Sequence, residues 1–389
     1  MQWLLRGDTN QVDLNSRMSI IAIVYIAVIA PCVFILQPGY VQGLVEYLAF
    51  SEEQAGYIAS AEMFGIAFTT ILLIFIESRF DWRKLAVLCL IVAMTGNLLS
   101  LSLVDFKSLA AVRFLTGMGS GGLMSLTFAM MGLTDKSDRN FGYIITWVLI
   151  YGALGILVMP TAFATIGMDG VLLFFALFNV SGLFFTRYLP RSGVHHLDLS
   201  VPEGASYSWQ LKGLSLLAIL VYNTSIGIVW AYLFLLGLEA GIAEQTVANV
   251  LTVSQFLGIA GAFVAVVLQL RIGRIIPLQV SIIGTAIGIY ILVGKIALFH
   301  FALGVCLFNF LWNVSMPYLL ATLASFDRRG KVVIYGICMQ TAGFALGPFI
   351  AATILGASSY DQVYTVATLL FIASAIVLLP GLIAQKKYL

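Results

Sequence analysis

Residues Ser108–Leu133 read SLAAVRFLTGMGSGGLMSLTFAMMGL, an apolar stretch that carries a single charged side chain. A helix needs about 20 apolar residues to cross a bilayer, so this stretch is long enough to span one. Arg113 lies inside the apolar run, where a charge costs about 3 kcal/mol and is normally paired or functional. At helical spacing Arg113 shares one face with small residues, namely Gly117, Gly121 and Ser125. Small residues let another helix or a solute approach closely, so this face is expected to meet protein or a cavity rather than lipid.

The whole chain has the composition of a membrane protein. Of its 389 residues, 61% are hydrophobic and 10% are charged, whereas soluble domains average about 25% charged residues. The polar start of the chain is followed by an apolar run too long for a signal peptide, so we expect a cytoplasmic tail and then a first span. The four cysteines lie far apart and form no CxxC pair, so we expect no metal site and no cofactor.

Hydropathy predicts twelve spans, six on each side of a polar linker. The first six are Met18–Gln37, Gln54–Ile76, Leu85–Val104, Ser108–Leu133, Phe141–Ile166 and Gly170–Tyr188. The second six are Leu211–Gly237, Gln245–Leu270, Ile275–Val293, Ala297–Thr322, Val332–Leu355 and Gln362–Ala384. We therefore expect an all-α membrane protein with two six-helix bundles, residues 1–188 and 211–389, joined by a linker over residues 189–210 that includes His195 and His196.

The distribution of Lys and Arg predicts the orientation of the chain, because cytoplasmic segments carry an excess of both. With both termini in the cytoplasm, 17 of the 20 basic residues fall on the cytoplasmic side. Only Lys107 and Lys295 fall outside, and Arg113 lies within a span. The same assignment makes the linker cytoplasmic.

Only one acidic residue is expected inside the membrane, where it could pair with Arg113. Seventeen of the eighteen lie in loops, tails or span ends, and the exception is Glu62 in the second predicted span. Both helices run inward from the outer side, and at 1.5 Å per residue both charges lie roughly 10 Å below the outer surface. We therefore predict a contact between Glu62 and Arg113.

The two halves of the chain repeat weakly. AEMFGIAF at Ala61–Phe68 aligns with SQFLGIAG at Ser254–Gly261, and each follows an acidic loop and precedes a basic turn. In this register Glu62 corresponds to Gln255. Duplicated halves are how many transporters form a site near the membrane midplane.

Together these features resemble the major facilitator superfamily of secondary transporters over essentially the whole chain. The turn Ser78–Lys84 resembles a degenerate form of the family's motif between the second and third spans, and Arg113–Gly121 is similar to its Arg-x-x-x-Gly-x-Gly pattern. Gly152, Gly155 and Pro160 only loosely resemble the motif associated with exporters. The resemblance implies that Arg113 is linked to proton coupling, as in several branches of the family.

The family fold also implies that spans 1, 4, 7 and 10 surround a cavity, with spans 2, 5, 8 and 11 beside them. We expect solute contacts from polar and aromatic residues there, namely Tyr25, Tyr151, Tyr222, Asn223, Trp230, Gln255, Asn309, Trp312, Asn313 and Gln340. Tyr222, Asn223 and Trp230 are expected on one face of the seventh span. An amide in lipid must find a hydrogen-bond partner, so these residues face inward. Bonds to neighbouring helices are the alternative role for each of them.

Glu62 has two roles open to it. Burial disfavours the charged form of a carboxyl, whereas a nearby arginine favours it. Their balance allows Glu62 to bind the coupling proton with Arg113 tuning it. The alternative is a fixed structural ion pair.

These residues favour a proton-coupled secondary transporter that moves a small neutral or singly charged organic solute by alternating access. Phosphate or multicarboxylate carriers usually need more than one cavity cation. Multidrug-type efflux of amphipathic compounds is an alternative, and uptake and export both stay open. A membrane enzyme or sensor is disfavoured, because the spans hold one acid and no central histidine. The expected partners are the solute, protons and the lipid of the cytoplasmic (inner) membrane, with no nucleic acid and no second protomer.

Overall fold

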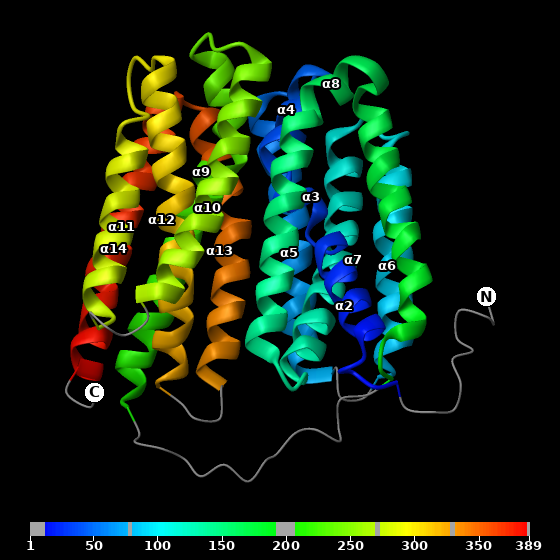
Figure 1. Ribbon diagram of the computed structural model, residues 1–389. Coiled ribbons are helices and arrows are strands. Elements are labelled where there is room, and N and C mark those ends of the chain that lie inside the picture. The colour runs from blue at the N-terminus through cyan, green and yellow to red at the C-terminus, as the bar shows by residue number, and fades with distance from the viewer. Residues whose placement is uncertain (1–11, 77–79, 192–206, 269–272, 327–330, 387–389) are drawn as a thin grey trace. The chain divides into compact units, whose positions relative to one another are not determined.

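The computed structural model describes residues 12–76, 80–191, 207–268, 273–326 and 331–386 (Figure 1). These residues form α-helices and one short 3-10 helix, Thr186–Tyr188, joined by turns and loops, and no strand occurs among them. The predicted all-α class is confirmed. Most of the predicted linker, including His195 and His196, lies outside the described residues.

Helices α2 to α8 run from blue to green in Figure 1, and α9 to α14 from green to red. The first group is α2 (Arg17–Ile29), α3 (Cys32–Ile35), α4 (Gln37–Glu46), α5 (Glu52–Ile76), α6 (Trp82–Ser100), α7 (Phe106–Gly132) and α8 (Ser137–Phe185). The second group is α9 (Trp209–Glu239), α10 (Glu244–Leu268), α11 (Ile275–Tyr290), α12 (Leu298–Ala324), α13 (Lys331–Leu355) and α14 (Tyr360–Lys386).

Within the described part of the chain, 9 helices are long and apolar enough to cross a membrane. Two further apolar helices, α2 and α11, are shorter. The chain is therefore a multi-pass membrane protein. Its helices follow the predicted spans closely except at two places, the first span and the fifth and sixth spans.

The first predicted span, Met18–Gln37, is not one helix. The structure divides this region into α2, α3 and α4 and continues the last piece to Glu46. Pro31 directly precedes α3 and Pro38 lies in the first turn of α4. Proline has no backbone N–H to donate and clashes with the preceding turn, so a straight helix cannot pass through both positions. The single-helix prediction was wrong here because hydropathy does not register the breaks that proline causes in a helix.

The fifth and sixth predicted spans lie in one element, α8, with a sharp break at Gly167. That residue has φ 64° and ψ −174°, a backbone conformation outside the helical range. Glycine adopts positive φ without steric cost. The predicted connection between the two spans is thus shorter than expected and centres on this one residue.

Helix α7, which holds Arg113, has a well-defined start. The Asp105 carboxylate accepts hydrogen bonds from the Ser108 backbone N–H (2.9 Å) and hydroxyl (2.9 Å), as an N-cap residue does. These hydrogen bonds favour the charged carboxylate and lower the pKa of Asp105.

Glycines allow α7 to approach α5 and α6 very closely. A Cβ atom on Gly117 would overlap the backbone carbonyl of Glu62 in α5, and one on Gly121 would overlap the carbonyl of Ile66. A Cβ on Gly119 would lie 2.6 Å from the carbonyl oxygen of Cys89 in α6. The small face predicted around Arg113 therefore contacts a helix, α5, at Gly117 and Gly121.

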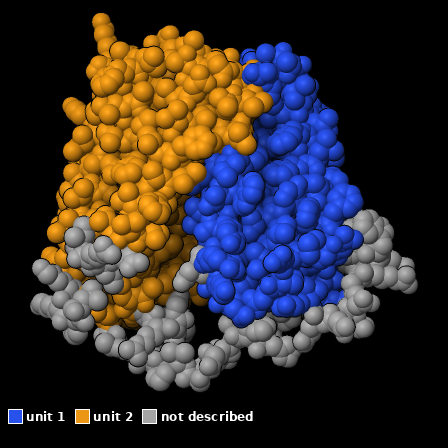
Figure 2. Space-filling view, viewed as in Figure 1, with its two compact units in different colours: residues 1–50, 61–151, 161–199 blue, residues 51–60, 152–160, 200–389 orange. Residues whose placement is uncertain are grey.

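The chain divides into two compact units (Figure 2). Unit 1 comprises residues 1–50, 61–151 and 161–199, and unit 2 comprises residues 51–60, 152–160 and 200–389. The first turns of α5 thus group with the second half of the chain. Within unit 2, the Tyr232 hydroxyl donates to the Glu52 carbonyl (2.9 Å) and the Ser60 hydroxyl to the Ala345 carbonyl (2.7 Å).

Candidate functional site

Glu62 and Arg113 form a buried ion pair in unit 1. The Arg113 Nη2 atom lies 2.6 Å from Glu62 Oε1, and Nε donates a hydrogen bond to Oε2 at 3.2 Å. Glu62 is 2% exposed and Arg113 is 0% exposed. The predicted contact between the two residues is confirmed, as an ion pair with one hydrogen bond and one further close N···O contact.

The close approach of α5 and α7 brings this pair together. Gly117 lies one turn after Arg113 and packs on the backbone of Glu62, while Gly65 packs on the Phe114 carbonyl. Gly117 thus packs on the charged residue of α5 itself, and Gly65 packs on the residue that follows Arg113 in α7. Because neither position carries a Cβ, the helix axes lie close enough for the Glu62 and Arg113 side chains to reach each other.

Asn97 of α6 is a further partner of Arg113 that the sequence did not reveal. Arg113 Nη1 donates to Asn97 Oδ1 at 2.7 Å, and Asn97 Nδ2 donates to the Ala93 carbonyl at 3.0 Å. The second bond orients the amide with its oxygen toward the guanidinium. Asn97 is 1% exposed. One signal was available: it is the only amide in the predicted third span, Leu85–Val104.

Tyr40 of α4 completes the surroundings of Arg113. Its ring centroid lies 5.2 Å from the Arg113 Cζ atom, within the range of a cation–π interaction. The Tyr40 hydroxyl is buried and has no hydrogen-bond partner. Sequence reasoning missed this residue because the predicted first span ended at Gln37.

The pair is electrically neutral as a whole, which makes its burial tolerable. Charges removed from water need good geometry and further hydrogen bonds to offset the loss of hydration, and here Asn97 supplies one. Chemically, the cluster offers a carboxyl that can exchange a proton beside a cation that stays charged.

Two predicted solute-contact residues of unit 1 meet on a third aromatic ring. Tyr25 and Tyr151 each lie against Phe178, with ring centroids 5.8 Å and 5.5 Å apart. The Tyr25 hydroxyl is hydrogen-bonded to the Ser181 hydroxyl at 2.8 Å. The Tyr151 hydroxyl is buried without a hydrogen-bond partner.

In unit 2, Trp312 lies at the centre of an aromatic cluster. Its ring centroid is 6.1 Å from Trp230, 5.6 Å from Phe308 and 6.2 Å from Phe344. The structure thus brings the predicted residues Trp230 and Trp312 into contact. Trp312 is only half-buried whereas Trp230 is buried, so Trp312 is the ring of this pair with the more accessible surface.

The amides of α12 lie beside α10. Asn309 Nδ2 donates to the Ser254 hydroxyl at 2.8 Å, and Asn313 Nδ2 donates to the Asn309 carbonyl at 2.9 Å. The Asn309 side-chain oxygen is buried without a hydrogen-bond partner. Gln255, next to Ser254, is buried, and Gln340 of α13 is half-buried.

The residues expected on one face of the seventh span contact two different neighbouring helices. The Tyr222 hydroxyl is hydrogen-bonded to Ser315 of α12, and Trp230 also contacts α12. Asn223 instead packs on Gly343 of α13. Consecutive helical residues are about 100° apart, so a face that holds both Tyr222 and Asn223 is broad enough to meet two helices.

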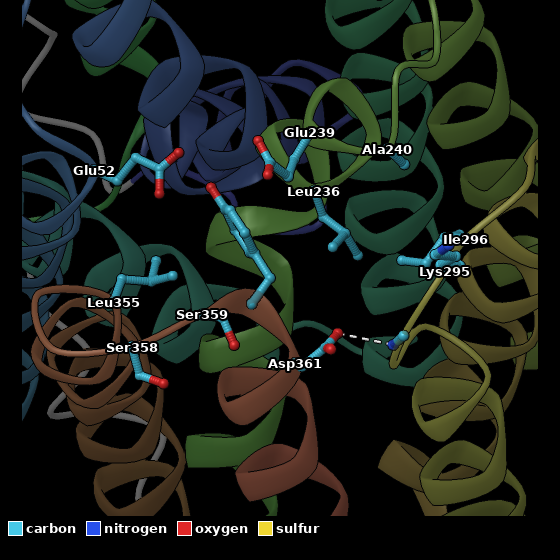
Figure 3. A pocket seen from close by; sticks show the side chains of 12 residues that line it. Glu52, Leu236, Glu239, Ala240, Lys295, Ile296, Leu355, Ser358, Ser359 and Asp361 are labelled. Atoms are coloured by element: carbon cyan, nitrogen blue, oxygen red, sulfur yellow. Dashed lines mark hydrogen bonds between the residues drawn. The ribbon is translucent and has the colours of Figure 1, made fainter.

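Unit 2 also contains a cavity of about 570 Å³ that includes none of the predicted site residues (Figure 3). Glu52, Glu239 and Asp361 line it together with Lys295. The Asp361 carboxylate accepts a hydrogen bond from the Gly294 backbone N–H at 2.7 Å. These residues lie at helix ends and in loops, where charged residues occur in any membrane protein, and so the sequence did not mark them.

The sequence matches no family model and no curated protein. Solved structures do match. A mutant of the nucleoside transporter NupG has 10% sequence identity and a TM-score of 0.76, covering 93% of this chain and 99% of that one. The POT family transporter PepTSo has 13% identity and a TM-score of 0.73, covering 95% and 98%.

A D-xylose-proton symporter has 14% identity and a TM-score of 0.72, covering 93% of this chain and 96% of that one. Identities this low carry the fold and nothing finer. The chain shares the fold of these transporters, which agrees with the resemblance seen in its residues.

Proposed function

We propose that this chain, which shares its fold with transporters, is a secondary active transporter of a small neutral or singly charged organic solute. It works by alternating access as a monomer in the cytoplasmic membrane, with twelve spans and both termini in the cytoplasm. Its bundles are residues 1–188 and 211–389, joined by the linker 189–210. The transporter fold, together with a fully buried Glu62–Arg113 pair, carries this proposal.

Proton coupling follows from the chemistry of the pair. When Glu62 is ionised it neutralises Arg113, and when it binds a proton the charge attraction is lost. The number of charges in unit 1 therefore changes with each proton, and the membrane potential acts on that change with about 2.3 kcal/mol per charge per 100 mV. A neighbour in fold is named as a proton symporter, which supports this coupling.

The solute contacts are assigned to Tyr25 and Tyr151 in unit 1 and to the aromatic and amide residues around Trp312 in unit 2. Aromatic rings bind flat apolar faces, and amides bind hydroxyl or amine groups. The named solutes of two structural neighbours, a nucleoside and D-xylose, belong to this chemical range.

Replacing Glu62 with glutamine is expected to abolish solute accumulation driven by a pH gradient while downhill solute exchange continues. Glutamine keeps the size of the side chain but cannot bind the coupling proton. The measurement is uptake into liposomes containing the purified protein, screened with neutral sugars, nucleosides and monocarboxylates. Glu46→Gln, which changes an exposed acid of unit 1, is the control. Unchanged accumulation in Glu62→Gln excludes the coupling role.

Replacing Trp312 with alanine is expected to weaken solute binding by about fivefold, because an aromatic contact contributes roughly 1 kcal/mol beyond its buried area. Trp312→Phe keeps a ring and should retain most of the affinity. Trp209, an exposed residue at the start of α9, supplies the control Trp209→Ala. Equal affinity in the wild type and Trp312→Ala would remove Trp312 from the solute site.

A further inference from the structure

Arg113 has three partners among the described residues, and only Glu62 loses its negative charge when it binds a proton. Glu62 offers a carboxylate, Asn97 a neutral amide oxygen and Tyr40 the face of its ring. All three residues are buried, with at most 2% of their surface exposed. Arg113 itself remains charged at any physiological pH. A proton on Glu62 therefore leaves a buried cation that still needs partners.

Asn97 is placed to meet that need. Its oxygen accepts from Arg113 Nη1, whereas Glu62 is bound through Nε and Nη2, so the two partners do not compete for one nitrogen atom. Its amide nitrogen is held by the Ala93 carbonyl, which keeps the oxygen aimed at the arginine. Helices α6 and α7 are in contact here, because a Cβ on Gly96 would overlap the side chain of Thr116.

We propose that Asn97 is a positioning residue for proton exchange: it holds Arg113 in place while Glu62 carries the proton. This inference rests on the proposed coupling role of Glu62. In the step, a proton binds one carboxylate oxygen of Glu62, the ion pair with Arg113 is broken, and the cluster gains one positive charge. Arg113 keeps its hydrogen bond to Asn97 and its contact with Tyr40, so the carboxyl is the group free to move.

The other titratable groups that face Arg113 do not replace this role. They are Tyr40 from α4 and Cys32 from α3, together with Glu62 from α5. A phenol and a thiol are neutral at neutral pH. Neither supplies an oriented oxygen acceptor to Arg113, since Tyr40 presents its ring and Cys32 a thiol. Asn97 is the neutral acceptor of the cluster in the described part of the chain.

The first test is an infrared titration of the purified protein, which requires no solute. The carboxylic acid band that disappears in Glu62→Gln belongs to Glu62. Asn97→Leu removes the acceptor that the protonated state needs most, so the titration midpoint should move to lower pH by about one unit. Asn97→Asp gives Arg113 a second carboxylate, and its negative charge should move the Glu62 midpoint to higher pH. An unchanged midpoint in both variants overturns the proposal.

Asn179 supplies a matched control. It is also buried in unit 1, and its Nδ2 donates to the Phe175 carbonyl four residues earlier, as Asn97 does to Ala93. Asn179→Leu removes a comparable amide away from Arg113 and should leave the Glu62 midpoint in place. A shift as large as that of Asn97→Leu would mean that any buried amide in the unit has this effect, and would overturn the assignment.

The second test measures stability and does not depend on transport. Glu62→Gln imitates the protonated carboxyl, so Asn97→Leu should lower the melting temperature by about 5 °C more in that background than in the wild type. Additive losses overturn the role of Asn97. If Glu62 does not titrate in the wild type, the proposed coupling fails, and this stability comparison still decides whether Asn97 holds Arg113.

Discussion

Replacing Arg113 with leucine is expected to lower the melting temperature of the purified protein by about 10 °C. Removing one partner of a buried ion pair costs about 3–5 kcal/mol, because the remaining charge stays buried without a partner. Each kcal/mol corresponds to roughly 2–4 °C in domains of about 150–250 residues. Here the remaining group is Glu62, which is 2% exposed. Thermal unfolding in detergent, followed by circular dichroism, measures the change.

The matched variant is the double change Arg113→Leu with Glu62→Leu. Replacing both charges by apolar groups of similar size is often neutral or stabilising, so the double variant should recover most of the lost stability. It should still fail to accumulate solute with a pH gradient. A double variant as unstable as Arg113→Leu alone would show that the loss comes from the packing of Arg113 rather than from its charge.

Replacing Gly117 with alanine is expected to disrupt unit 1 although it adds only one methyl group. The added Cβ would overlap the backbone carbonyl of Glu62, and a backbone atom cannot rotate away. Overpacking of this kind costs about 1–3 kcal/mol, and more where the backbone must shift. Separating α5 from α7 would also pull Glu62 away from Arg113. We expect a melting temperature lower by at least about 5 °C, together with loss of pH-driven accumulation.

Gly132 is the control on the same helix, since a Cβ there meets nothing within 4 Å. Gly132→Ala should leave stability unchanged or raise it slightly, because alanine favours helix over glycine by about 1 kcal/mol. Equal melting temperatures for Gly117→Ala and Gly132→Ala would contradict the close packing of α5 and α7.

The ion pair was predictable from sequence because charges inside apolar runs are rare and their depth can be counted along a helix. Glu62 and Arg113 were each conspicuous, and their equal depth was enough to predict their contact. Asn97 was not predictable in the same way, because an amide in a span has several ways to be satisfied. Its role depends on which way α6 faces, and hydropathy carries no information on that.

Two other differences have local causes. Pro31 and Pro38 divide the first span. Tyr40, which was expected in a loop, therefore lies in helix α4 beside Arg113. On α9, nearly every residue in the middle of the helix is buried, so polarity did not reveal which side faces α12 and which faces α13. Tyr222 and Asn223, which were expected on one face, contact different helices.

The burial of the Glu62–Arg113 pair also bears on how the chain enters the membrane. Helix α5 precedes α7 in the sequence, so the acid is synthesised before the base that neutralises it. Inserting either charge alone costs about 3 kcal/mol on insertion scales, whereas the two helices together bury a neutral pair. The glycine contacts that join α5 to α7 thus favour the entry of these helices as a neutral pair.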